Sequence, residues 1–98
     1  MRLVVTPGGD VAALVGAACG TDAQPAVDSI VVVIAPIADP LDDARTRAAI
    51  APLAIRHAPG VRINAVACGE GATPADVDSA VAFLEGARST TGQILRVD

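Results

Sequence analysis

Tyrosine, tryptophan and lysine are all absent from this 98-residue sequence, and Phe83 is its only aromatic residue. A core without aromatic rings must be packed from aliphatic side chains, and hydrophobic residues make up 52% of the chain. That fraction excludes intrinsic disorder. A chain of this length buries roughly two-thirds of its unfolded surface on folding. We therefore expect one domain that spans residues 1–98.

Positive charge is also sparse, because all seven basic residues are scattered arginines and the formal net charge is -4. An acidic surface repels phosphate groups, so we expect neither nucleic acid nor an anionic membrane as a partner. The first ten residues lack a signal-peptide pattern, and no apolar run approaches the ~20 residues that span a bilayer. These features predict a cytoplasmic protein. Cys19 and Cys68 lie far apart without metal-ligand spacing, which predicts two reduced thiols and no metal site.

Four short apolar runs rich in β-branched residues predict β-strands. The second run is apolar at five successive positions, which is typical of a strand covered on both faces and favours a parallel sheet. The predicted fold class is therefore α/β, a small Rossmann-like domain with about four parallel strands and three helices. The runs are Leu3–Val5, Ile30–Ile34, Val61–Ala67 and Ile94–Val97.

Two helices are predicted between the first three runs. The first covers residues 10–18, with Asp10 as its N-cap and Gly20 beyond its end. The second extends from about residue 42 to residue 58. Pro52 lies inside the second helix, where a missing N–H and a bulky ring should bend or interrupt it.

A third helix has the clearest start signal in the chain. Thr73 can accept a hydrogen bond at the N-terminus, Pro74 suits the first helical position, and Asp76 places negative charge in the first turn. Its apolar positions recur at helical spacing, so one face should pack on the sheet. These positions are Val77, Ala80, Val81 and Leu84.

Several motifs in the second half of the chain occur in a familiar order. Residues 60–69 read GVRINAVACG, residues 73–77 read TPADV, residues 83–84 read FL, and residues 91–98 read TGQILRVD. Over residues 42–98 this series resembles the C-terminal part of a short-chain dehydrogenase/reductase (SDR), which reads GIRVNAVAPG, TPEDV, FL and TGQVLxVD. The resemblance implies a Rossmann-like fold and oxidoreduction of carbonyls and alcohols with a nicotinamide cofactor.

The catalytic residues that the resemblance implies are missing. The family uses a Tyr that exchanges a proton, a Lys four residues later and a Ser that orients the substrate. A phenol with a pKa near 10 is a poor base at neutral pH without a nearby cation. Asp39 and Asp43 stand where the Tyr and the Lys would be, and two carboxylates cannot imitate that pair. We therefore expect no catalytic residue in this chain.

The dinucleotide motif of the family, TGxxxGxG, is also eroded. Its glycines let the backbone approach a pyrophosphate at a helix N-terminus. Gly8 and Gly9 can still form a tight turn, so Thr6, Gly8 and Gly9 are the candidate cofactor-binding residues, although Asp10 would repel an anion there. We expect no cofactor on the chain alone, and NAD(P) only where a partner completes the site. Counted from Thr6, the three glycine positions hold Pro7, Val11 and Ala13.

Other polar residues have structural interpretations, two of them with open alternatives. His57 lies near a helix end, where a dipole contact is simpler than a role as a base. Cys68 follows a strand at a sheet edge, as a small apolar filler or as a nucleophile. The aspartates at 39, 42 and 43 suit a solvated helix start, with metal binding as the alternative. Structural roles in strand ends and turns are expected for Asn64, Thr91 and Gly92.

The leading functional hypothesis is a non-catalytic SDR-like subunit or scaffold that associates with itself or with a full-length catalytic dehydrogenase. Two alternatives are an NAD(P)-dependent oxidoreductase whose missing site is completed by a partner chain, and a small-ligand binder that uses the Gly8–Gly9 turn. Four strands in sequence order with right-handed crossovers would place all three helices on one face. The other face would be bare, so we expect a homodimer or a hetero-oligomer with a full-length SDR. A non-sequential strand order would instead place helices on both faces.

Overall fold

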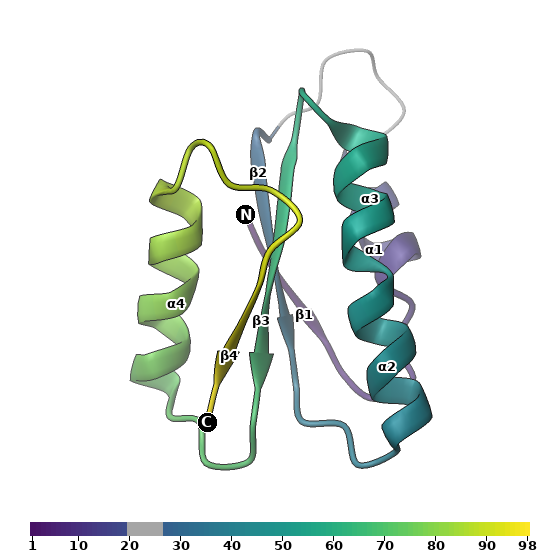
Figure 1. Cartoon of the computed structure of the whole chain (residues 1–98), viewed down its shortest axis with the longest axis vertical. Coiled ribbons are helices and arrows are strands. Elements are labelled where there is room, and N and C mark those ends of the chain that lie inside the picture. The colour runs from purple at the N-terminus through teal and green to yellow at the C-terminus, as the bar shows by residue number, and fades with distance from the viewer. Residues whose placement is uncertain (20–26) are drawn as a thin grey trace.

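Four parallel strands form one sheet in the order β1-β2-β3-β4 in the computed structural model, which describes residues 1–19 and 27–98 (Figure 1). Helices pack on this sheet, so the predicted α/β, Rossmann-like fold class is confirmed. The strands are β1 (Arg2–Val5), β2 (Ser29–Ile34), β3 (Arg62–Cys68) and β4 (Ile94–Val97).

Two of the helices begin at the predicted caps. Asp10 Oδ1 accepts a 3.1 Å hydrogen bond from the amide of Ala13 at the start of α1 (Val11–Cys19). Thr73 Oγ1 accepts a 3.2 Å bond from the amide of Asp76 at the start of α4 (Pro74–Gly86). Gly20, expected beyond the first helix, lies outside the described residues. Among the residues that are described, no helix has the length and apolarity needed to cross a membrane.

The predicted helix over residues 42–58 is two helices, α2 (Pro40–Ala48) and α3 (Ile50–His57). Pro52 has no N–H for the carbonyl of Ala48, and its ring crowds that carbonyl, so α2 ends there. The expected interruption is confirmed. Ala49, which joins the two helices, keeps helical angles of φ -72 and ψ -22, and α3 continues the direction of α2 in Figure 1.

The core is divided into two clusters by the sheet. All six residues of β2 are buried, as expected for a strand covered on both faces. Ile30, Val32 and Ile34 pack with α1 and α3 in the first cluster. Val31 and Val33 point to the opposite face and pack with α4 in the second cluster. The second cluster is completed by Val66 of β3 and by Val81 and Leu84 of α4.

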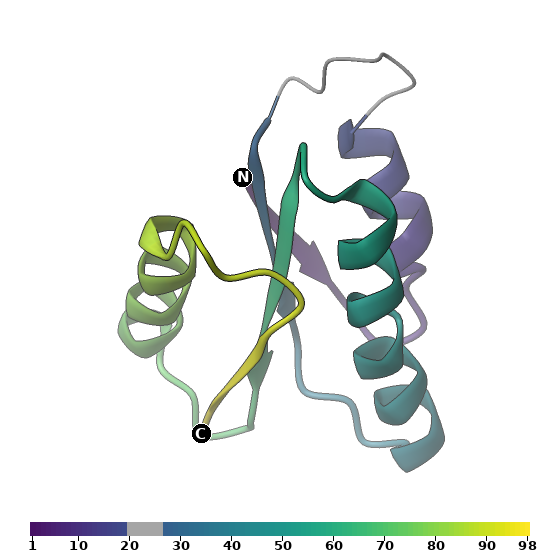
Figure 2. The same ribbon diagram turned by 45° about the horizontal axis from the view of Figure 1, so that its top comes forward.

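The expectation that all helices lie on one face is wrong. Figure 2 shows α4 on one side of the sheet and the other helices on the opposite side. Because the strands step in one direction, the β3–α4–β4 connection has the opposite hand to the other two connections. Burial of the second cluster, which a parallel sheet requires, outweighs the usual preference for one hand. A bare sheet face is therefore no longer an argument for association.

Candidate ligand site at the carboxyl edge of the sheet

A cavity of about 230 Å³ opens at the carboxyl edge of β2 and β3. Ligands of open α/β sheets bind at this edge. Residues 36–38 and 67–70, which include the segments that follow the two strands, form much of its wall. Charged side chains complete it, from α2 through Asp43 and Arg47 and from β4 through Arg96.

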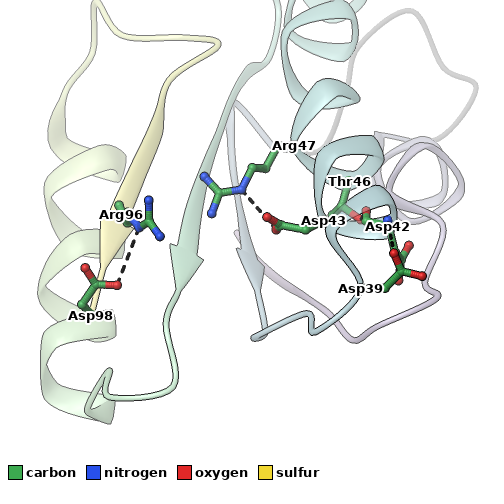
Figure 3. A network of polar contacts seen from close by, with 7 residues as sticks. All are labelled: Asp39, Asp42, Asp43, Thr46, Arg47, Arg96 and Asp98. Atoms are coloured by element: carbon green, nitrogen blue, oxygen red, sulfur yellow. Dashed lines mark hydrogen bonds and ion pairs between the residues drawn. The ribbon is translucent and has the colours of Figure 1, made fainter.

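Two guanidinium groups point toward one another across this site (Figure 3). Arg47 Nε donates a 3.1 Å hydrogen bond to Asp43 Oδ1, one helical turn earlier on α2. Arg96 Nε lies 3.6 Å from Asp98 Oδ1. Arg47 is thus held through Nε, Arg96 has its Nε near Asp98, and the two terminal nitrogens of each can present a fork to a carboxylate or a phosphate.

Carboxylates limit how strongly this site can attract an anion. Glu70 lines the cavity together with Asp43, and Asp98 pairs with Arg96 at its rim. Three carboxylates beside two guanidinium groups leave no net positive charge. The arrangement therefore suits weak, geometry-dependent binding of a small carboxylate or phosphate group.

Cys68 lines the same cavity at the end of β3, and its side chain is half-buried. Burial raises the pKa of the Cys68 thiol, and it also raises the pKa of the buried Cys19 thiol. Both cysteines are free, as predicted. Because the thiolate is the nucleophilic form, a raised pKa favours the interpretation of Cys68 as an apolar filler.

The Gly8–Gly9 turn follows β1 and is already occupied by a carboxylate of the same chain. Gly8 has φ +82, which suits glycine, and its N–H donates a 3.1 Å hydrogen bond to Asp42 Oδ2. The N–H of Gly9 donates to the carbonyl of Thr6 at 2.9 Å. A pyrophosphate would have to displace Asp42 and approach Asp10, so the turn does not fit a dinucleotide. These three turn residues are not among those that line the described cavity.

The aspartates before and in α2 all have structural partners. Asp39 Oδ1 accepts from the amides of Leu41 at 2.9 Å and Asp42 at 3.5 Å and so caps α2. Asp42 accepts from the amide of Gly8. Asp43 accepts from Arg47, as Figure 3 shows. Within residues 1–19 and 27–98 no group of three or more potential metal ligands is present. The helix-start interpretation is confirmed, since Asp39 is the N-cap and Asp42 and Asp43 lie in the first turn, although these last two are half-buried and bonded instead of solvated.

Comparison with known families places the chain by its sequence. The sequence model of the family described as SDR-like, short chain dehydrogenase-like protein, matches residues 9–97. The chain belongs to this short-chain dehydrogenase-like family. The match extends the resemblance seen over residues 42–98 back to the start of α1. No curated protein and no solved structure matches the chain.

In this SDR-like chain, the RINA and TGQ motifs hold β4 against β3. Asn64 is fully buried, its Nδ2 donates to the carbonyl of Thr90, and its Oδ1 accepts from the amide of Gln93, both at 3.0 Å. Thr91 Oγ1 accepts from the amide of the residue before Asn64 at 3.1 Å. Gly92 has φ +78 and donates to the carbonyl of that same residue at 2.7 Å. The structural roles predicted for these motif residues are confirmed.

Sequence reasoning missed Arg47 and Arg96 as a pair in the SDR-like chain. Asp43 and Arg47 carry a readable signal, because opposite charges four residues apart pair on a helix. Arg96 carries none, since only the folded sheet brings β4 near α2. The contact between Gly8 and Asp42 joins residues 34 positions apart and likewise has no local signature.

Proposed function

We propose that this chain is a non-catalytic SDR-like subunit or scaffold that associates with itself or with a full-length catalytic dehydrogenase. The observation that carries the proposal is the engagement of Asp39 and Asp43, which the family resemblance sets opposite its Tyr and Lys. Asp39 caps α2 and Asp43 holds Arg47, so both carboxylates serve the local structure. With no Tyr and no Lys in the sequence, the chain has no phenol with a lowered pKa to exchange the proton.

The occupied Gly8 amide supports the same proposal. A carboxylate at 3.1 Å from that amide competes with any phosphate. Titration calorimetry of the purified chain with NADH and with NADPH should therefore show no binding in the micromolar range, and carbonyl substrates should not be reduced. A micromolar dissociation constant, or turnover by the chain alone, would contradict the proposal.

Two variants test whether Asp42 is what keeps phosphate from the Gly8 amide. Asp42→Ala frees the Gly8 amide, and Asp78→Ala removes an exposed carboxylate of α4 as the matched control. We expect millimolar phosphate binding to appear only in Asp42→Ala. The same titration tests the small-ligand alternative, because a ligand at the Gly8–Gly9 turn must also displace Asp42.

The partner is tested with the tagged full chain in its native cell. We expect an NAD(P)-dependent oxidoreductase to be recovered with it, and the recovered activity should belong to a chain that has its own Tyr–Lys pair. A chain that neither self-associates nor recovers such an enzyme would refute the subunit role.

The alternative is an NAD(P)-dependent oxidoreductase whose Tyr, Lys and dinucleotide loop come from a partner chain. The 230 Å³ cavity at the carboxyl edge, with Arg47 and Arg96, favours it. In that case Arg47→Ala and Arg96→Ala should raise the KM of the assembled enzyme for an acidic substrate. Arg88→Ala, at an exposed position in the turn after α4 and outside the cavity, should not. Under the leading proposal all three variants leave the partner's kinetics unchanged.

A further inference from the structure

Helix α1 has no polar side chain anywhere between Val11 and Cys19, yet only one stripe of it is buried. Val11, Val15 and Cys19 pack into the first core cluster. A helix that is apolar on every side is normally covered on every side. The solvent-facing positions of α1 therefore form an apolar surface, which consists of Ala12, Ala13, Leu14, Gly16 and Ala17.

Strand β1 lies beside α1 and is one of the two outer strands of the described sheet, behind the others in Figure 1. The carbonyl of Met1 accepts from Val31 of β2 at 2.8 Å, and that of Val5 accepts from Ala35, just after β2, at 3.0 Å. By alternation Arg2 and Val4 turn their backbone groups outward. Val4 is 58% exposed, because α4 covers β2 to β4. Natural edge strands are protected by Lys, Pro or bulges, and β1 has a single Arg.

We propose that the apolar face of α1 and the open edge of β1 form an isologous interface with a second copy of this chain. The inference rests on the proposed function, because it assigns a surface to the self-association named there. A chain with a net charge of -4 repels its copy over most of its surface. A two-fold axis brings the same surface of both copies together. Because the face of α1 has no charged side chain, two copies can meet there without that repulsion. Arg2, at the margin, is already neutralised by Asp78 at 2.8 Å.

The strand register of this interface follows from charge and burial. An antiparallel β1 pair centred on Arg2 would place two like charges opposite each other. A pair centred on Leu3 gains little, because Leu3 already packs against the first cluster. A pair centred on Val4 lets each Val4 exchange both backbone hydrogen bonds with its copy, places Arg2 opposite Thr6, and covers the exposed valine. The interface therefore joins two sheets through Val4.

Sedimentation equilibrium of the full chain at micromolar concentration should give twice the monomer mass of 9.7 kDa. Val4→Lys places like charges at the axis, Leu14→Glu places a charge on the 38% exposed Leu14 of α1, and each should weaken dimerisation by ~10-fold or more. Phe83→Lys and Ile55→Lys are the matched controls, at apolar positions on α4 and α3 that are 64% and 77% exposed. Both controls should leave the dimer unchanged.

A crosslink tests the register without requiring a stable monomer. Hydrogen-bonded antiparallel partners have Cα atoms about 5.5 Å apart, which suits a disulfide. In a Cys68→Ser background, Val4→Cys should give a covalent dimer on mild oxidation. Phe83→Cys in the same background should give none.

A single 9.7 kDa species, or a dimer that Phe83→Lys or Ile55→Lys breaks while Val4→Lys does not, would overturn the inference. The second result leaves the proposed function intact, because the chain would still associate with itself through another face. The proposed function fails instead when the purified chain binds NADH and turns over a carbonyl substrate, whatever its oligomeric state.

Discussion

Asn64→Ala should destabilise the protein more than any surface substitution. The Asn64 amide is fully buried and makes two 3.0 Å hydrogen bonds, to the carbonyl of Thr90 and from the amide of Gln93. Each bond contributes about 1 kcal/mol net, and a buried partner left unsatisfied costs a further 1–3 kcal/mol or so. Because the Thr90–Gln93 segment is only partly buried, water can recover some of that cost. We expect a loss of roughly 3 kcal/mol.

Urea denaturation followed by circular dichroism measures this loss, which in a domain of this size corresponds to a Tm decrease of roughly 12–24 °C. Gln93→Ala is the control and should cost under about 0.5 kcal/mol, because Asn64 contacts only the Gln93 backbone. Asn64→Asp keeps the acceptor but loses the donor, so it should recover stability on acidification as the carboxyl gains a proton. A loss below about 1 kcal/mol in Asn64→Ala would refute the reasoning.

Two further substitutions have expected outcomes. Pro52→Ala should change stability by under about 1 kcal/mol in urea denaturation, because Pro52 ends α2 but lies in the first turn of α3, where proline is tolerated. A gain near 3 kcal/mol would mean that Pro52 strains the helix instead of fitting its first turn. Burial raises the pKa of the Cys19 and Cys68 thiols, so above about pH 8.5 the unfolded state binds fewer protons and stability should fall as pH rises. The double Cys→Ala variant should lose the part of this pH dependence that the thiols contribute, and an unchanged pH dependence would exclude the thiols as its source.

Local signals predicted most of the elements. Asp10 and Thr73 act through hydrogen bonds that span three residues, so their caps could be read from neighbouring letters. The continuous apolar run of β2 likewise predicted burial on both faces from neighbouring residues alone, because successive side chains of a strand point to opposite faces of the sheet. The RINA and TGQ motifs identified the family and the region of Asn64.

Long-range geometry could not be read in this way. The face on which α4 packs depends on the summed burial of Val31, Val33 and Val66, which competes with the handedness of the crossover, and no single segment encodes that balance. The candidate site has the same limitation. Gly8 meets Asp42, and Arg47 faces Arg96, only because β1 and β4 end, and α2 begins, at one edge of the sheet.

The placement of α4 has a consequence for how the sequence can change. The two core clusters lie on opposite faces and are separated by the strands themselves, so the side chains under α1 and those under α4 pack in different groups. Free-energy changes from distant, independent sites add. Substitutions under α1 and under α4 can therefore accumulate without compensating one another, and the two halves of this interior are free to diverge at different rates.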